Sequence, residues 1–245
     1  MSEDGVGNLL KFLGTEHQQI LTTLVTCREE FDAFSQLDAL YQAVLANREV
    51  SGQNLVLHQL FIFAHYHLYF AISTLMRCHL SEAFASARVA IDAALAAAIM
   101  IEDRSLQAAY IKREKPFDKL VRHYKNLIRD SKSVPEMVPH LIKRHDFCSR
   151  YASHADMDVF IHRSSVIEGP GDVLAVGYFQ FPDSPNMMRM YILQLLHDFI
   201  VVLDTFSAFF VDEIRFAPEN WRQALRGLGN FVEDRLRILE PTPTK

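Results

Sequence analysis

Apolar residues recur at three- and four-residue steps along most of this chain, which is the spacing of an α-helix that buries one face. The spacing holds over residues 15–44, 54–79, 81–102, 105–115, 116–130, 135–158, 184–210 and 218–240. The break near residue 80 is so short that the helices on either side of it should form an antiparallel hairpin. We therefore predict an all-α fold, a multi-helix up-and-down bundle.

The period changes once, after residue 163. Ser164–Ile167 and Asp172–Phe181 read as strands, and the segment Glu168-Gly169-Pro170-Gly171 between them is typical of a turn. We predict an inserted β-hairpin at about 164–181. Without an internal repeat or a shift in composition, residues 1–240 are expected to form a single helical domain, and 241–245 a disordered tail.

The run from Leu55 to Met76 contains no charged residue and is long enough to cross a membrane. Histidines interrupt it and no basic residue flanks its start, so a helix buried in a bundle is favoured over a membrane span. The chain starts with an acidic segment that lacks a signal-peptide core, and its three cysteines form no CxxC pair. These features predict a cytoplasmic protein with no membrane partner.

The formal charge of −5 gives no general attraction to nucleic acid, so recognition of phosphate would need a local cluster of charges. Arg88 and Asp92 are the first candidate pair. They are the only charged residues between Ala83 and Ile101, and their i, i+4 spacing lets them pair. On so apolar a helix they should lie at an internal seam or on the floor of a cleft. A purely structural pair is the alternative.

A second candidate cluster precedes the expected hairpin. If residues 145–158 are helical, Arg150, His154 and Asp158 share one face. Arginine can hold phosphate oxygens in a bidentate fork, and histidine can move a proton near neutral pH. A surface helix end whose charges neutralise one another explains the same residues. The neighbouring polar residues that belong to this cluster are Ser153, His162 and Arg163.

Other chemistry finds little support in the sequence. The histidines and acidic residues offer no set of three ligands at metal-binding spacing, and no HExxH or cysteine cluster occurs. Phosphate-binding glycine loops and the GxSxG elbow are also missing. We expect neither a metal nor a cofactor. Aromatic residues in the helices at 54–79 and 184–210 fit a packed core, or else a ligand pocket between the two helices.

The Arg88–Asp92 pair in the second helix of a hairpin, followed by Arg150-Tyr151-Ala152-Ser153-His154 late in a helix, resembles the HEPN superfamily of helical proteins, in particular its abortive-infection-like prokaryotic branches. The resemblance covers residues 50–215 at most. It implies a homodimeric, metal-independent ribonuclease in which His154 handles the 2′-hydroxyl proton and Arg150 steadies the phosphate. Three residues separate Arg150 from His154, one fewer than in the family motif.

Together these features predict a nucleotide- or RNA-directed polar cleft, formed where the helices at 81–102 and 135–158 lie side by side. Arg150 and His154 would be its catalytic residues, and Arg88, Asp92, Ser153, Asp158, His162 and Arg163 would bind the ligand. RNA or a nucleotide and a second copy of the chain are the expected partners. Two alternatives stay open: a non-enzymatic scaffold or interaction protein, and a sensor with an aromatic-lined pocket.

Overall fold

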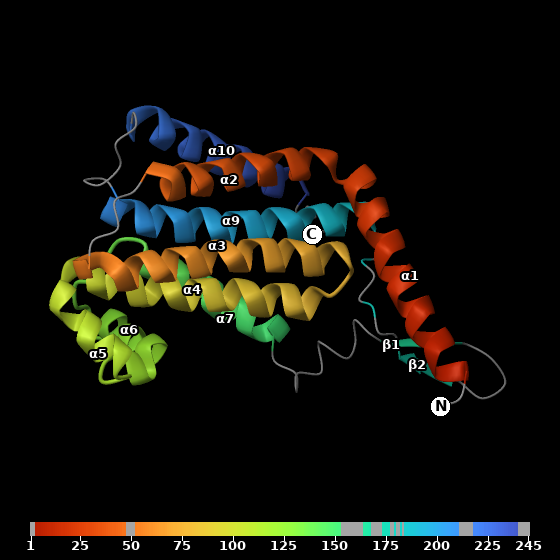
Figure 1. The fold of residues 1–245 in the computed structure, drawn as a ribbon, viewed down its shortest axis with the longest axis horizontal. Helices are drawn as coiled ribbons and strands as arrows, with labels where there is room; N and C mark the ends of the chain where they lie inside the picture. The colour runs from red at the N-terminus through yellow and green to blue at the C-terminus, as the bar shows by residue number, and fades with distance from the viewer. Residues whose placement is uncertain are drawn as a thin grey trace, which may run out of the picture.

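A computed structural model describes residues 3–47, 52–152, 164–167, 173–176, 184–210 and 218–239, together with Phe179 and Pro182. Over these residues the protein is an all-α helical bundle (Figure 1). Its α-helices are α1 (Glu3–Thr26), α2 (Arg28–Asn47), α3 (Leu55–Met76), α4 (Leu80–Glu102), α5 (Gln107–Ile111), α6 (Leu120–Arg129), α7 (Val138–Ala152), α9 (Pro185–Phe210) and α10 (Pro218–Leu239). Short 3-10 helices η1 (Gly52–Asn54), η2 (Arg104–Leu106) and η3 (Phe117–Lys119) join some of them.

Helix α4 lies at the centre of the bundle, where α3, α7 and α9 pack against it on different sides. Its sequence explains this position, because small side chains let neighbouring helices approach closely and a helix that is apolar all round must be buried. The buried alanines of α4 are Ala83, Ala87, Ala90, Ala93, Ala94, Ala96, Ala97 and Ala98. The expected hairpin of α3 and α4 is confirmed: residues 77–79 connect two antiparallel, closely packed helices.

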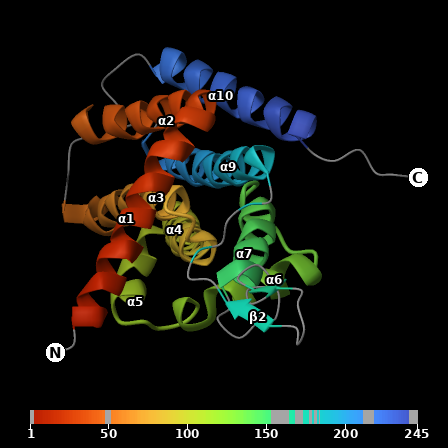
Figure 2. The same cartoon turned by 90° about the vertical axis from the view of Figure 1, so that its right-hand side faces the viewer.

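The remaining long helices form a layer over this centre. Helix α9 packs on α4 and α3, and α2 and α10 cover its other side while contacting each other. Figure 2 shows α2 and α10 together on one side of α9, and α7 and α6 on the other side of the molecule. Three described helices, α3, α4 and α9, have the length and apolarity of a membrane span. The bundle buries 72% of the 18-residue apolar stretch in α4 and in α9, but only 50% of the corresponding stretch in α3.

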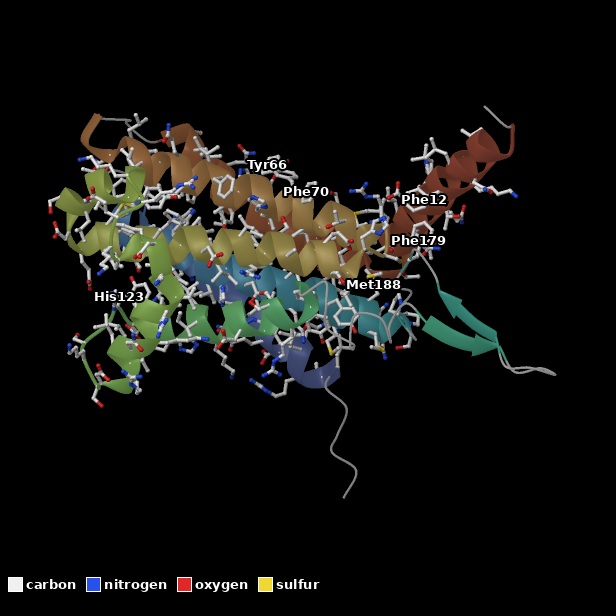
Figure 3. The ribbon with its side chains drawn as sticks, turned by 90° about the horizontal axis from the view of Figure 1, so that it is seen from below. Phe12, Tyr66, Phe70, His123, Phe179 and Met188 are labelled. Carbon is white, nitrogen blue, oxygen red and sulfur yellow. The ribbon has the colours of Figure 1, made fainter. Side chains whose placement is uncertain are left out.

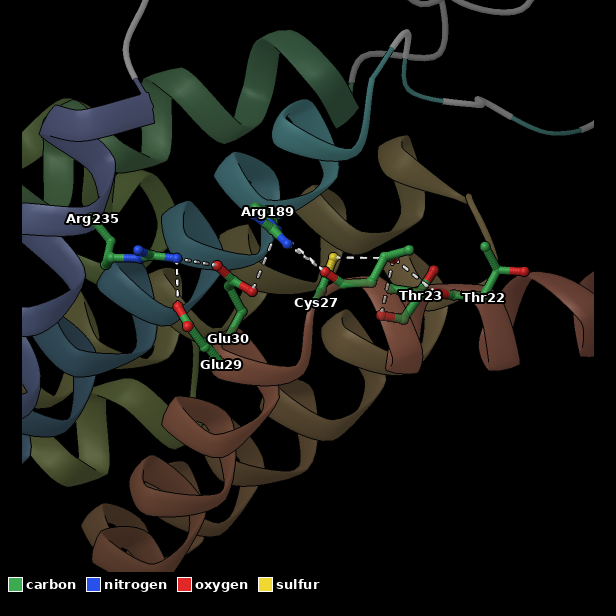
Figure 4. Close-up of polar contacts among 8 residues, drawn as sticks. Thr22, Thr23, Cys27, Glu29, Glu30, Arg189 and Arg235 are labelled. Carbon is green, nitrogen blue, oxygen red and sulfur yellow. Dashed lines mark hydrogen bonds and ion pairs between the residues drawn. The ribbon is translucent and has the colours of Figure 1, made fainter.

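The first helix differs from the expectation. The sequence pattern predicted one helix from Thr15 to about Val44, but the structure has two helices, α1 and α2, that meet at Cys27. Arg189 of α9 donates from Nε and Nη2 to the Thr26 carbonyl oxygen, at 3.2 and 2.9 Å, and so supplies partners to the end of α1 (Figure 4). Apolar spacing alone cannot reveal a bend that a distant arginine stabilises.

Buried charge surrounds this bend. The Glu30 side chain is 1% exposed and lies between two guanidinium groups, 4.0 Å from Arg189 Nε and 3.6 Å from Nη2 of Arg235 in α10. Glu29 also contacts Arg235, as the dashed lines in Figure 4 show. A buried carboxylate needs such partners because water cannot solvate it. The cluster therefore links the α1–α2 bend to α9 and α10.

Two four-residue strands, β1 (Ser164–Ile167) and β2 (Val173–Val176), pair antiparallel with Ser164 opposite Val176. They are too short to change the helical architecture of the protein. Residues 168–172 and 177–178, and most of the segment up to 181, lie outside the described residues, so the longer inserted hairpin at about 164–181 stays a prediction. The expected tail at 241–245 also lies outside them.

A second buried ion pair ties α7 to α9. Arg144 Nη2 lies 3.0 Å from Asp198 Oδ2, and Arg144 Nε also donates to Asp198, whose side chain is 1% exposed. Burial raises the pKa of Asp198, and the Arg144 guanidinium acts in the opposite direction. The Cys148 thiol donates to the same carboxylate at 3.5 Å. These contacts hold the middle of α7 against the core.

Replacing Arg144 alone should destabilise the protein severely, because it leaves the Asp198 carboxylate buried without its partner. We expect Arg144→Met to lower the free energy of unfolding by about 3–5 kcal/mol in urea denaturation. The double variant Arg144→Met with Asp198→Leu should recover most of that loss. Arg122→Met, at an exposed position of α6, is the control and should stay within about 0.5 kcal/mol of wild type. A wild-type midpoint for Arg144→Met would contradict the stabilising role of this ion pair.

Candidate functional site

Arg88 and Asp92 face a hollow between α4 and the segment that contains η3 and α6. The hollow has a volume of about 550 Å³, and we call it the Arg88 pocket. Both charged side chains are half-buried, so they reach the hollow from a helix that is otherwise covered. The residues that line the pocket are Leu60, Phe63, Arg88, Val89, Asp92, Ala93, Ala96, Tyr110, Phe117, Lys119, Leu120, Val121, Arg122 and His145.

His145 of α7 joins Asp92 in the pocket. Its Nε2 atom lies 3.5 Å from Asp92 Oδ1, and its Nδ1 atom lies 3.4 Å from Asp146 Oδ1. Lys125 of α6 in turn contacts the Asp146 oxygen at 2.7 Å. Carboxylates beside both ring nitrogens hold the imidazole in a fixed orientation next to Asp92.

The environment of Asp92 changes its acidity. Burial raises the pKa of Asp92, while His145 and Arg88 act in the opposite direction. The side chain is still 42% exposed, so it keeps contact with the hollow. A carboxyl group with a raised pKa that faces a hollow is typical of a candidate functional site.

The pocket also contains more cations than its carboxylate can neutralise. Within the described residues no carboxylate lies within 4 Å of Arg88, Lys119 or Arg122, although Arg88 acts on Asp92 electrostatically. Lys119 and Arg122 are exposed at the rim, and Arg88 lies deeper. Unpaired guanidinium and ammonium groups around a hollow favour an anionic ligand, and phosphate oxygens suit a guanidinium fork.

Part of the pocket wall is aromatic. Phe63 comes from α3, Tyr110 from α5 and Phe117 from η3, where the ring centroids of Tyr110 and Phe117 lie 5.2 Å apart. Phe63 is partly exposed, so a face or edge of its ring is free for contact. A flat aromatic group can stack on such side chains while its charged part contacts the cations.

The structure brings two of the site residues predicted from the sequence into the pocket and places a third outside its lining. Helices α4 and α7 are packed together, as a shared cleft requires. Arg88 and Asp92 line the pocket, but Arg150 is exposed in the last turn of α7 and is not among the lining residues. Arg150 follows His145 by five positions, so the two side chains leave the helix about 140° apart. Ser153, His154, Asp158, His162 and Arg163 lie outside the described residues.

The sequence reasoning missed His145. Leu141, His145 and Cys148 follow one another at helical spacing and are all buried, so a histidine in the buried stripe of α7 was the available signal. Nothing in the sequence marks Lys119 and Arg122 as site residues, because isolated charges before and within a short amphipathic helix are common on protein surfaces.

From the sequence we also considered a metal site and a ligand pocket lined by the aromatic residues of α3 and α9. Within the described part of the chain, no group of three histidine, cysteine, aspartate or glutamate residues could hold a metal ion. Of the aromatic residues of α3, Phe61 packs against α9 in the core, with 5.3 Å between the ring centroids of Phe61 and Phe206 and 4.8 Å between those of Phe61 and Phe210.

In comparisons with known proteins, no family model, no curated protein and no solved structure matches the chain. The function of the protein therefore has to be inferred from the geometry and charge of the Arg88 pocket.

Affinity of the pocket for an anion should increase as the pH falls. Asp92 repels an anion when ionised, and its raised pKa brings its protonation closer to neutral pH than that of an ordinary carboxyl group. We expect Asp92→Asn to bind a dinucleoside monophosphate, whose phosphodiester keeps one charge over this range, about 5-fold more tightly at pH 7. Its affinity should vary less between pH 7 and pH 5 than that of wild type. Calorimetric titrations measure both, and identical pH profiles would contradict the role of Asp92.

Proposed function

We propose that the protein binds a nucleotide or a segment of RNA in the Arg88 pocket. The observation that carries the proposal is the Arg88 guanidinium, which faces the hollow beside the Asp92–His145 pair without a carboxylate within 4 Å among the described residues. Such a group needs an anionic partner or water. Lys119 and Arg122 at the rim add to the attraction for phosphate, and the aromatic wall suits a base.

The reaction that we propose for this site is metal-independent cleavage of RNA. His145, held by Asp146 at Nδ1, would take the proton of a 2′-hydroxyl at Nε2, the nitrogen that faces Asp92, as the hydroxyl oxygen attacks the adjacent phosphorus. The new 2′-O–P bond replaces the P–O5′ bond, and the 5′-oxygen leaves with a proton from water. Arg88 would stabilise the negative charge on the phosphorus oxygens. The HEPN resemblance supports the same reaction class but assigns it to Arg150 and His154.

Binding tests the first part of the proposal. Arg88→Met should weaken binding of a fluorescein-labelled oligoribonucleotide roughly 10- to 100-fold in fluorescence anisotropy, the range expected for losing a charge-assisted hydrogen bond. Arg150→Met is the matched control, since it removes an exposed guanidinium from outside the pocket. Equal effects of the two substitutions would point to general charge attraction, and a larger effect of Arg150→Met would favour the cluster at 150–163.

Cleavage tests the second part. In the presence of EDTA, we expect His145→Ala to lower the rate of RNA cleavage at least 100-fold, the usual contribution of a general base. Replacing the 2′-hydroxyl groups of the substrate by hydrogen should abolish cleavage and preserve binding. Loss of activity in His154→Ala with full activity in His145→Ala would move the catalytic role to the 150–163 cluster. No cleavage by wild type over varied RNAs would refute the catalytic proposal and leave the binding proposal.

A second candidate function is a non-enzymatic interaction protein. The observation in its favour is the amount of apolar side chain left exposed on α3 and α1. Leu10, Leu13 and Val25 illustrate this for α1. The inserted β-hairpin at about 164–181 belongs to this alternative, because β1 and β2 form a two-stranded sheet whose edges could pair with a partner strand.

A further inference from the structure

The outward face of α3 carries a band of exposed aromatic and aliphatic side chains. Ile62, Phe63, Tyr66, Tyr69 and Phe70 are 42–58% exposed, and Tyr66 is the most exposed of them. We call these five residues the α3 band. Figure 3 shows Tyr66 and Phe70 side by side along this helix, away from the packed centre. A contiguous apolar band of this extent is about as large as the largest patch that a monomer usually exposes, and such a patch often marks a contact surface.

The order of residues in the α3 band is symmetric about Tyr66. Ile62 and Phe70 lie four residues on either side of it, and Phe63 and Tyr69 lie three residues on either side. The next exposed positions, Gln59 and Ser73, lie seven residues on either side, and both are polar. If two copies of α3 pack antiparallel about a two-fold axis at Tyr66, each residue faces the one at the symmetric position in the second copy. Ile62 then meets Phe70, Phe63 meets Tyr69, and the polar Gln59 meets the polar Ser73.

The charges around the band favour a second protein copy over lipid. Helix α3 has no aspartate, glutamate, lysine or arginine, so two copies meet without repulsion or buried unpaired charge. At the edge of the band, however, the Tyr69 hydroxyl donates to Asp38 Oδ1 of α2 at 2.7 Å, and the Asp38 side chain is partly exposed. Inserting the band into a bilayer would bring this carboxylate into the apolar region at a large cost, whereas a protein interface can keep it at a wet rim.

We propose that the α3 band is a self-complementary dimer interface, in which α3 of one copy crosses α3 of a second copy at Tyr66. The exposed area is sufficient for this. A whole aromatic side chain has a surface of about 150–250 Å². Because the five side chains of the α3 band are 42–58% exposed, roughly 450 Å² of their surface is accessible on each copy. With Gln59 and Ser73 the pair buries about 1,000 Å², the lower limit of a specific interface. An interface of this size is typical of a weak, transient dimer.

The interface also reaches the Arg88 pocket. Phe63 belongs both to the α3 band and to the aromatic wall of the pocket. In the proposed dimer, Phe63 packs against Tyr69 of the second copy, which fixes the ring that forms this wall. The dimer itself depends only on the α3 band, so it stands or falls separately from the proposed function.

Sedimentation velocity over 1–200 μM tests the proposal with residues 1–245. Wild type should shift from monomer to dimer with rising concentration. Tyr66→Glu should remain monomeric at all concentrations, because the two-fold axis places the two substituted side chains against each other. Tyr66→Lys should do the same. Val25→Glu is the matched control: it adds the same charge at an 80% exposed position of α1 and should dimerise like wild type.

Mixing the two charged variants provides the decisive measurement. An equimolar mixture of Tyr66→Glu and Tyr66→Lys should form heterodimers, because opposite charges then meet at the axis. Monomeric wild type at 200 μM, dimers of Tyr66→Glu, or a mixture that stays monomeric would each overturn the proposal. Co-flotation of wild type with neutral phosphatidylcholine vesicles, lost in Tyr66→Glu, would overturn it in favour of lipid. Circular dichroism of each variant verifies that it is folded.

Discussion

The rest of the structure depends on how α4 keeps the two charges in its middle, Arg88 and Asp92, solvated while neighbouring helices cover it. An alanine-rich helix at the centre of a bundle offers no water to a guanidinium or a carboxylate, and an unpaired buried charge is very costly. Arg88 and Asp92 can therefore exist only where the packing around α4 leaves an opening. That opening is the Arg88 pocket, which η3 and α6 border on the other side. The hydration of these two side chains therefore explains why a hollow with charged residues in its lining lies beside the apolar helix α4.

The same constraint acts differently in α7 and around the α1–α2 bend. There the charged groups are compensated by other side chains: Arg144 pairs with Asp198, and Glu30 lies between Arg189 and Arg235. These pairs connect helices that are far apart in sequence and leave little freedom for an outside ligand. The contrast separates structural charges from candidate functional ones. Charges that are satisfied within the core hold helices together, and charges that face a hollow without a partner are open to a ligand.

Much of the helical bundle could be predicted from apolar spacing, because the α3–α4 hairpin, α9 and α10 are long periodic segments with clear breaks. The bend at Cys27 could not be predicted, since the Thr26 carbonyl finds its partner in Arg189, more than 160 positions later. In the site, the rarity of charge on α4 identified Arg88 and Asp92. The contribution of α7 depended on how that helix is rotated, and one helical residue changes the direction of a side chain by about 100°. His145 therefore lies beside Asp92, whereas Arg150, which was predicted from the sequence to lie in the same cleft, is not among the residues that line the pocket.

The buried state of the three cysteines has a practical consequence. Burial raises the pKa of Cys27, that of Cys78 to about 11, and that of Cys148, where the Asp198 carboxylate adds to the effect. Hardly any thiolate exists at neutral pH, so maleimides, peroxide and disulfide reagents find little to attack in the native chain. A cysteine introduced on the surface would be the single reactive thiol of the molecule. Fluorophores or spin labels can then be attached at chosen positions without first removing the native cysteines.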